Sequence, residues 1–180
     1  MKRFPVYIIS VVIALTALSA CLKTDDDDKY KDWRLENEQW YNTQKLNTSY
    51  YTVVQPTWNT GVDILMHWYN DRSLTAGNLK PLYTSTVDVK YHGALYDGTA
   101  FDSSYLRTSP ADSIFRLQVN SNVIEGWAVA LTNMRVGDSC RVVIPYNLGY
   151  GSYSRGTVIK PYSMLVFDMK LQQIYTYETK

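Results

Sequence analysis

The feature that most constrains the fold is a strict alternation of apolar and polar residues near the middle of the chain. It runs over six consecutive positions, Val87, Asp88, Val89, Lys90, Tyr91 and His92. Successive side chains of a β-strand point to opposite sides, so the pattern predicts a strand with one buried face.

Other strand and turn signals follow. Asp97-Gly98 marks a turn, because this dipeptide accommodates positive φ. Three more segments have the composition or alternation of strands: residues 115–119, 139–144 and 164–174. Several strands of this kind predict an antiparallel sheet.

One short helix is predicted among these strands, over residues 123–134. Ile124, Trp127, Ala128 and Leu131 recur at helical spacing, and Gly137-Asp138 follows the end of the segment. We therefore expect an α+β fold in which a curved antiparallel sheet wraps on one short helix.

The segment before the sheet, residues 32–82, reads as an N-terminal extension. Trp33 and Trp40 lie seven residues apart, which places both on one face of an amphipathic helix over residues 32–46. This helix is expected to dock on the domain or on another molecule. Residues 50–54 and 62–69 are β-rich and predict a hairpin or two early strands.

The start of the chain has the pattern of a signal peptide over residues 1–20. Lys2 and Arg3 precede a mostly apolar run that ends in Leu-Ser-Ala-Cys. This ending resembles the bacterial lipobox, which implies cleavage before Cys21 and lipidation of its thiol. The alternative is a short anchor that is never cleaved.

An acidic tether is expected over residues 21–31, because four consecutive aspartates, Asp25 to Asp28, repel one another and cannot pack. The run resembles a surface-export signal of lipoproteins in Bacteroidetes; the alternative is a plain spacer. The expected location is the cell envelope, lipid-anchored at the outer membrane, on its periplasmic or its external side.

Composition argues against several functions. Without residues 1–20 the formal net charge falls from +1 to −1, so no nucleic-acid partner is expected. Cys140 alternates with apolar neighbours and reads as a buried small hydrophobe. His67 and His92 lack metal-ligand spacing, so we expect no metal and no cofactor.

Six segments occur in a fixed order over residues 87–174: VDVKYHG, DGTAFDSS, NVIEGWAVAL, VGD, PYNLGYG and MLVFDMKL. In this order they resemble the FKBP-type peptidyl-prolyl isomerases, the macrolide-binding immunophilin family. The resemblance implies an FKBP-like isomerase domain over residues 83–180. It also implies proline-containing polypeptides as substrates and macrolides as a class of ligand.

Rotation about the peptide C–N bond is opposed by a barrier of ~18–20 kcal/mol, because the bond has partial double-bond character. A catalyst needs an apolar pocket for the proline ring and polar groups that favour the twisted bond over the planar one. The resemblance places Trp127 on the pocket floor. The implied aromatic walls, edge and covering loop are Tyr91, Phe101, Phe167, Val123, Ile124, Val158 and Ile159.

Three polar residues complete the implied site. Asp102 matches a buried carboxylate that acts on the carbonyl preceding proline, and Tyr150 matches a phenol that hydrogen-bonds a substrate carbonyl. Arg107 matches a basic residue near the carboxylate. Taken singly, each of these residues also fits an ordinary role in a core, turn or loop.

The sequence departs from the family pattern in several places. The segment after Arg107 is longer than usual, and no aromatic occurs at Ser113 or Ile114, so one side of the pocket is expected to be open. Arg155 stands where a histidine is common, and Lys160 replaces a proline. A weakly active or inactive binding or chaperone module is therefore the alternative to an isomerase, followed by a small β-barrel carrier of an apolar ligand.

Overall fold

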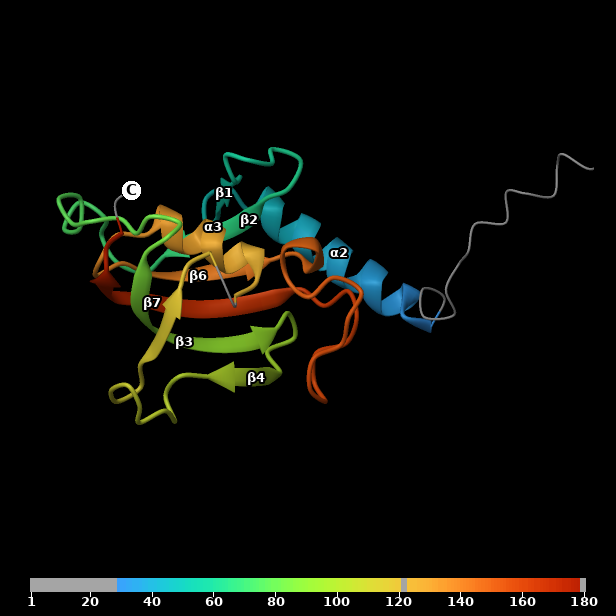
Figure 1. The fold of residues 1–180 in the computed structure, drawn as a ribbon. Helices are drawn as coiled ribbons and strands as arrows, with labels where there is room; N and C mark the ends of the chain where they lie inside the picture. The colour runs from blue at the N-terminus through green and yellow to red at the C-terminus, as the bar shows by residue number, and fades with distance from the viewer. Residues whose placement is uncertain (1–28, 121–122, 179–180) are drawn as a thin grey trace, which may run out of the picture. The chain divides into compact units, whose positions relative to one another are not determined.

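The strands pair into one antiparallel sheet (Figure 1). The computed structural model describes residues 29–120 and 123–178, and the described residues from Asp32 onward form one compact unit. In the described part the sheet has seven strands in the order β1-β2-β6-β7-β3-β4, with β5 paired to β3. The strands are β1 (Thr52–Val54), β2 (Ile64–Trp68), β3 (Thr86–Leu95), β4 (Ala100–Ser103), β5 (Phe115–Gln118), β6 (Ser139–Ile144) and β7 (Leu165–Thr176).

The long strands β3 and β7 form the middle of the sheet and pair along almost their whole length. The other edge of β3 is shared, since β5 pairs with its first residues and β4 with its last. The strands expected around residues 87–92, 115–119, 139–144 and 164–174 are confirmed. Strand β4 was not predicted, because its four residues are too few to show a period.

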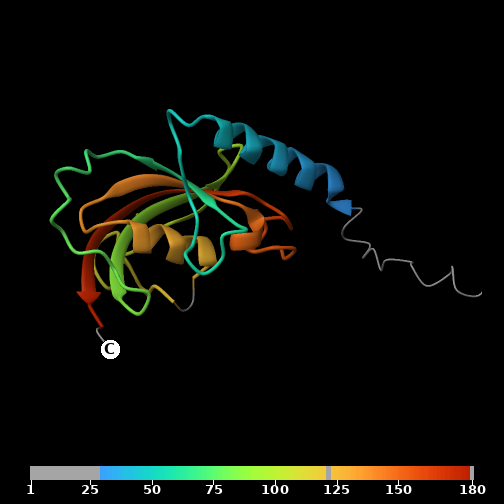
Figure 2. The same ribbon diagram turned by 90° about the horizontal axis from the view of Figure 1, so that it is seen from above.

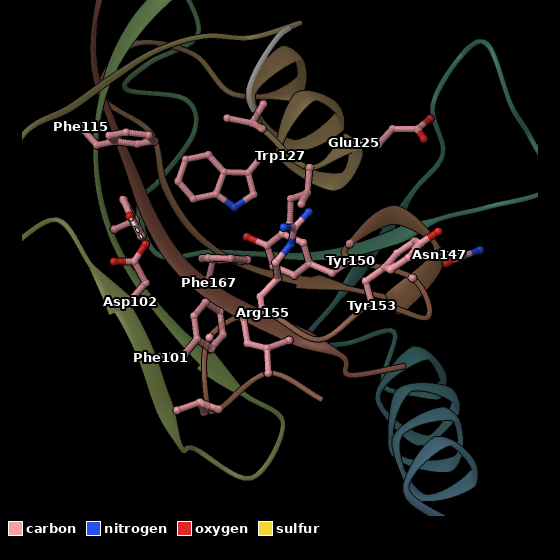
Figure 3. A pocket seen from close by; sticks show the side chains of 18 of the residues that line it. Phe101, Asp102, Phe115, Glu125, Trp127, Asn147, Tyr150, Tyr153, Arg155 and Phe167 are labelled. Carbon is pink, nitrogen blue, oxygen red and sulfur yellow. Dashed lines mark hydrogen bonds between the residues drawn. The ribbon is translucent and has the colours of Figure 1, made fainter. Parts of the chain in front are cut away.

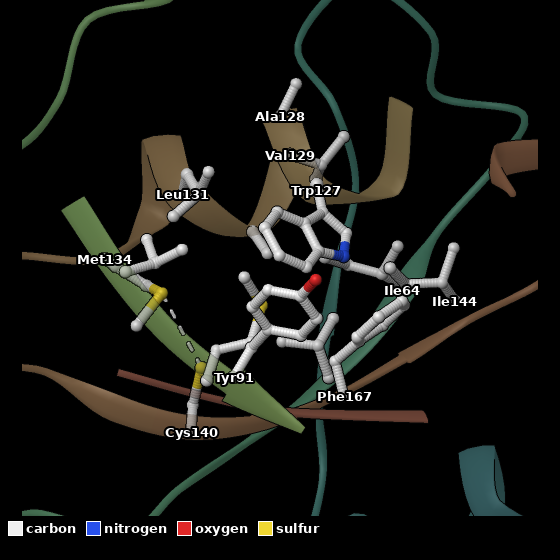
Figure 4. Packing of buried hydrophobic residues seen from close by; sticks show 14 of the residues in the cluster. Ile64, Tyr91, Trp127, Ala128, Val129, Leu131, Met134, Cys140, Ile144 and Phe167 are labelled. Carbon is white, nitrogen blue, oxygen red and sulfur yellow. Dashed lines mark hydrogen bonds between the residues drawn. The ribbon is translucent and has the colours of Figure 1, made fainter. Parts of the chain in front are cut away.

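Helix α3 (Glu125–Asn133) lies across one face of the sheet (Figure 2). It confirms the helix predicted over residues 123–134, with slightly shorter ends. Its side chains pack into a cluster that draws on β2, β3, β6 and β7 (Figure 4). A Cβ atom on Gly126 would lie 2.4 Å from Cγ2 of Ile144, so the close contact between helix and sheet requires glycine there.

Cys140 belongs to this core, as its alternation predicted. Its side chain is buried, and Sγ lies 3.7 Å from Sδ of Met134. Burial, chiefly through desolvation of the thiolate, raises the pKa of the thiol. The residue therefore acts as a packing group and not as a nucleophile.

Helix α2 (Lys31–Leu46) confirms the helix expected over residues 32–46. Trp33 and Trp40 are half-buried, and Asn37 and Tyr41 are the buried residues of the helix. Tyr41 packs in a second cluster with Leu65, Val143 and Met164. Val142 and Ile144, the neighbours of Val143 on β6, belong to the cluster of α3, so the two helices cover opposite faces of the sheet.

Strands β1 and β2 form the early hairpin that was expected, and β2 joins the sheet beside β6. The following loop, residues 70–81, is tied to the turn after α3 by the fully buried carboxylate of Asp138. This carboxylate accepts hydrogen bonds from Thr75 Oγ1 (2.5 Å), the Arg135 N–H (2.8 Å) and Asn70 Nδ2 (3.2 Å). It also pairs with Arg72. Burial opposes ionisation, but the hydrogen bonds and the arginine outweigh it and lower the pKa of Asp138.

The segment predicted as a signal peptide, Cys21 and the four aspartates of the predicted tether lie outside the described residues. Among the described residues, no helix is both long enough and apolar enough to cross a membrane.

Candidate active site

A cavity of about 1090 Å³ opens between the N-terminal end of α3, strands β3 to β5, and the segment that joins β6 to β7. Its size is slightly above the range of about 300–1,000 Å³ that is usual for ligand pockets. The eleven site residues expected from the sequence all line it: Tyr91, Phe101, Asp102, Arg107, Val123, Ile124, Trp127, Tyr150, Val158, Ile159 and Phe167. The structure thus brings together residues that are spread over 77 positions of the chain.

Aromatic rings form the inner part of the cavity (Figure 3). The indole of Trp127 contacts Tyr91 and Phe167 edge to face, with ring centroids 4.9 and 5.2 Å apart. Phe101 meets Phe167 in the same way at 5.5 Å. Such edge-to-face pairs are favourable and fix ring orientation. The rings therefore form an apolar socket with Trp127 at its base.

The expectation of an open wall near Ser113 was wrong. Phe115, the first residue of β5, lines the cavity, with its centroid 6.2 Å from Trp127 and 5.7 Å from Tyr91. The longer segment before it folds back on itself, because the Ser113 N–H donates to the Arg107 carbonyl at 2.8 Å. The aromatic thus lies slightly later in the sequence than the family pattern suggested. The guanidinium of Arg107 lies 4.7 Å from its ring centroid.

The socket depends on the absence of a side chain at Gly93. Strand β3 runs behind two of the rings here, with Gly93 paired to Asp102 on β4 and to Phe167 on β7. A Cβ atom at Gly93 would lie 2.7 Å from the Phe101 ring and 2.8 Å from the Phe167 ring. Only glycine allows both rings to lie against the strand.

The Asp102 carboxylate lies at the rim of the cavity. One oxygen accepts a hydrogen bond from the Tyr91 hydroxyl at 2.5 Å, and the other accepts from the Ser103 N–H at 2.8 Å. Desolvation and the bond to Asp102 raise the pKa of Tyr91 to about 12, so its hydroxyl remains protonated and donates at neutral pH. The family pattern implied a buried carboxylate; in this chain Asp102 is exposed, because β4 is an edge strand.

Tyr150 enters the cavity from the segment between β6 and β7, which we call the pocket loop (residues 147–162). In the described part of the chain, no group hydrogen-bonds its hydroxyl. Burial raises the pKa of Tyr150 although the nearby charge of Arg155 opposes this. The Arg155 guanidinium lies 5.2 Å from the ring centroid of Tyr150. The phenol is therefore protonated and can donate to a bound carbonyl.

The tip of the pocket loop is a small hairpin. The Arg155 N–H donates to the Ile159 carbonyl at 2.9 Å, and the Ile159 N–H donates back at 3.2 Å. Gly156 has φ of 56°, which the tight turn requires. The hairpin sets Val158 and Ile159 in the lining of the cavity, to which Val123 and Ile124 also belong.

Sequence reasoning missed seven lining residues that bear rings or polar groups: Phe115, Glu125, Asn147, Ser152, Tyr153, Arg155 and Thr157. Arg155 had been noted as a departure from the family but not assigned to the site. Glu125 accepts a hydrogen bond from the Trp58 indole at 2.8 Å, which links the N-terminal extension to the rim. No local pattern could show that contact, since the two residues are 67 positions apart.

Fold and site together define a class: an α+β domain with an aromatic socket for a small ring and polar groups at the mouth of the socket. Residues 77–172 match the model of a family described as FKBP-type peptidyl-prolyl cis-trans isomerase. The match covers just over half of the chain, and the chain belongs to this family.

Individual relatives agree with the family match. The FKBP-type 22 kDa peptidyl-prolyl cis-trans isomerase of Escherichia coli is 46% identical over 94 residues, which are 52% of this chain and 43% of that protein. The outer membrane protein MIP of Legionella longbeachae is 38% identical over 112 residues, 62% of this chain and 46% of that one. The chain thus spans about half the length of these relatives.

A solved structure is similar over a longer stretch. The crystal structure of a peptidyl-prolyl cis-trans isomerase from Pseudomonas syringae superposes with a TM-score of 0.65 at 27% identity. The superposition covers 82% of this chain and 96% of that one. The curved sheet with its packed helix, expected from the sequence, is therefore the FKBP fold.

Proposed function

We propose that the chain catalyses the cis–trans isomerisation of Xaa-Pro peptide bonds in polypeptides outside the cytoplasm and so assists their folding. The observation that carries this proposal is the aromatic socket on Trp127, with Asp102 and Tyr150 at its mouth. It lies within the segment that matches the isomerase family. Macrolides are the second class of ligand for the same socket.

In this mechanism the socket binds the proline ring and excludes water from one side of the imide bond. Burial of an apolar ring contributes about 25 cal/mol per Å² of apolar area. The floor and walls do not react. They fix the ring, so that the part of the substrate before the proline can turn against it while the imide nitrogen loses its conjugation.

The polar groups at the rim favour the twisted bond. The Tyr150 hydroxyl donates to a substrate carbonyl beside the socket, and the Ile124 N–H, at the start of α3, is a second donor at the pocket edge. The Asp102 carboxylate lies where it can act on the carbonyl carbon that precedes proline, which gains positive character as resonance is lost. Tyr91 fixes that carboxylate through its 2.5 Å hydrogen bond.

An isomerisation assay on Xaa-Pro peptides tests this function. Asp102→Asn and Tyr150→Phe should lower kcat/KM while the protein stays folded. Removal of one preorganised polar group can lower the rate about 10²–10³-fold, and we expect about tenfold for Asp102 because solvent screens its exposed carboxylate. Asp97→Asn is the matched control, because Asp97 is an exposed carboxylate in the β3–β4 turn and does not line the cavity.

The alternative function is a binding or chaperone module. It would be favoured if the wild-type chain does not accelerate isomerisation yet a macrolide quenches Trp127 fluorescence and the chain suppresses aggregation of unfolded clients. A wild-type chain that does not isomerise peptides, bind a macrolide or suppress aggregation would contradict both functions.

The proposed location is the cell envelope, with a signal peptide over residues 1–20, a lipid on Cys21 and an acidic tether over residues 21–31 before the extension (32–82) and the isomerase domain (83–180). The lipobox-like ending and a relative named as an outer membrane protein support it. Labelled fatty acid should enter the wild type and not Cys21→Ser. Equal labelling of both would remove the lipid anchor from the proposal.

The acidic run has its own test. If Asp25 to Asp28 direct export to the cell surface, their replacement by asparagine should reduce the access of protease to the protein on intact cells. Unchanged access would leave the run as a spacer.

A further inference from the structure

The pocket loop is joined to β6 through a first stem that contains Tyr146, and to β7 through a second stem formed by Tyr162, Ser163 and Met164. The two stems lie close together. The Gly151 N–H donates to the Tyr146 carbonyl at 2.8 Å, and the Tyr162 N–H donates to the Gly151 carbonyl at 2.8 Å. The rings of Tyr146 and Tyr162 meet edge to face at 5.4 Å. The position of Tyr150 therefore depends on how these stems are fixed.

Tyr162 has a backbone conformation that the loop alone does not favour. Its φ is 63°, in the left-handed region that side-chain-bearing residues rarely occupy. Such a residue persists when its surroundings determine its conformation. The surroundings of Tyr162 include helix α2, which lies beside this stretch of the chain (Figure 1).

Arg34 of α2 contacts both stems. Its guanidinium lies 5.3 Å from the ring centroid of Tyr146 and 5.0 Å from that of Tyr162. It also donates to the Tyr146 hydroxyl at 3.0 Å, and that hydroxyl donates to Glu38 of the same helix at 3.1 Å. Arg34 thus joins the helix to both stems through cation–π contacts, and hydrogen bonds add to the contact with the first stem.

Asn37, one helical turn further, fixes the second stem through the backbone. The residue is fully buried. Its Oδ1 accepts a hydrogen bond from the Met164 N–H at 2.8 Å, and its Nδ2 donates to the Trp33 carbonyl at 2.8 Å. The Trp33 indole in turn donates to Ser163 Oγ at 3.2 Å. A fully buried amide with both ends satisfied specifies one arrangement of helix and stem.

We propose that α2 positions the pocket loop, with Arg34 and Asn37 as positioning residues that act on the reaction through Tyr150. Helix α2 lies before the family segment, which begins at residue 77, so this support comes from outside the matched domain. The kinetic part of this inference rests on the proposed isomerase function. The structural part, that the loop is ordered by α2, does not.

Hydrogen exchange on the full-length chain tests the structural part. Arg34→Met and Asn37→Ala should make the amides of residues 151–162 exchange about tenfold faster, while those of β3 and β7 keep their protection. Tyr41→Phe is the matched control: it removes the two hydrogen bonds between the same helix and Asp63 while the ring keeps its packing against Met164. Because the Arg34 side chain is 43% exposed, its variant is expected to fold even if Asn37→Ala does not.

A double-mutant cycle tests the kinetic part. Each positioning variant should lower kcat/KM for an Xaa-Pro peptide about tenfold in the wild-type background, and much less in the Tyr150→Phe background, because the group being positioned is then absent. A general loss of stability would instead lower kcat/KM by the same factor in the wild-type and the Tyr150→Phe backgrounds. Unchanged exchange in the loop, or exchange raised no more than in Tyr41→Phe, would overturn the inference. If the wild type shows no isomerase activity, the proposed function fails and the exchange experiment still decides this inference.

Discussion

The two faces of the sheet are covered in different ways. Under α3 the contacts are almost wholly apolar, and the helix contributes six consecutive buried residues, Gly126 to Leu131. Under α2 the buried residues of the helix are an asparagine and a tyrosine, and both form hydrogen bonds across the interface. The first helix is held by packing and the second by directed polar contacts.

This difference suggests separate roles for the two interfaces, one in the stability of the fold and the other in the position of the pocket loop. Apolar packing contributes much of the stability and is not directional, whereas a hydrogen bond contributes little net energy and fixes a particular partner. We therefore expect changes under α3 to act mainly on the free energy of unfolding. Changes under α2 should act mainly on the geometry of the pocket loop.

The largest effect should come from Trp127→Ala. The ring is 4% exposed and forms both the pocket floor and part of the α3 core. Its truncation should lower the free energy of unfolding by ~3–5 kcal/mol, as measured by urea denaturation, and should abolish macrolide binding. A variant as stable as the wild type would show that the α3 face does not depend on packing at this point.

The second largest effect should come from Asp138→Asn, because Asp138 is a buried charged residue on the otherwise apolar α3 side of the sheet. The amide cannot accept from all four donors, so the free energy of unfolding at neutral pH should fall by ~1.5–3 kcal/mol. The pKa of Asp138 is lowered in the folded state, so its stabilisation is full above the unfolded-state pKa of about 3.9 and is lost as pH falls through the folded-state pKa. The difference between variant and wild type should therefore shrink below about pH 4. A difference that is constant from pH 7 to pH 3 would contradict this assignment.

Gly126→Ala tests the fit between helix and sheet. The new methyl would lie 2.4 Å from Cγ2 of Ile144, so α3 or the strand must move. Overpacking of this kind should lower the free energy of unfolding by ~1–3 kcal/mol, although alanine is the better helix former. Gly77→Ala is the control, because nothing lies within 4 Å of a Cβ atom there. Equal stabilities of the two variants would mean that the interface between α3 and β6 has room for a methyl group at position 126.

The smallest effect should come from Tyr41→Phe on the α2 face. It removes the hydrogen bonds to the Asp63 carboxylate (2.6 Å) and carbonyl (2.9 Å) but keeps the ring in its cluster. The free energy of unfolding should fall by ~0.5–1.5 kcal/mol, with kcat/KM unchanged. A loss as large as that of Trp127→Ala would remove the contrast between the two faces.

Much of the fold could be predicted because the spacing of apolar residues shows which face of a strand or helix is buried. The alternation from Val87 to His92 locates β3, and helical spacing locates α3. The buried side of α2 was harder, since the two tryptophans suggested the interface and are only half-buried. Asn37 could not be found from the pattern, because a polar residue reveals its burial only through its partner, here the Met164 N–H, which is 127 positions away.

The site was predictable as a set of residues and less so in its details. The ordered motifs located all eleven expected lining residues. Phe115 was missed because a longer loop precedes it in the sequence, whereas a backbone hydrogen bond closes that loop and the ring lines the cavity. The exposure of Asp102 depends on β4 being an edge strand, which is a property of strand order and not of local sequence.

A substitution at Gly93 could separate the socket from the rest of the protein in living cells. A methyl group there would press on the rings of Phe101 and Phe167 from behind, and Phe101, which is half-buried at the edge of the sheet, is the ring free to yield into the socket. Gly93→Ala would then shrink the space for a proline from its rear wall while every polar group at the mouth stays in place. Cells that carry such an allele would reveal whether the organism needs the proposed isomerase activity or only the folded protein.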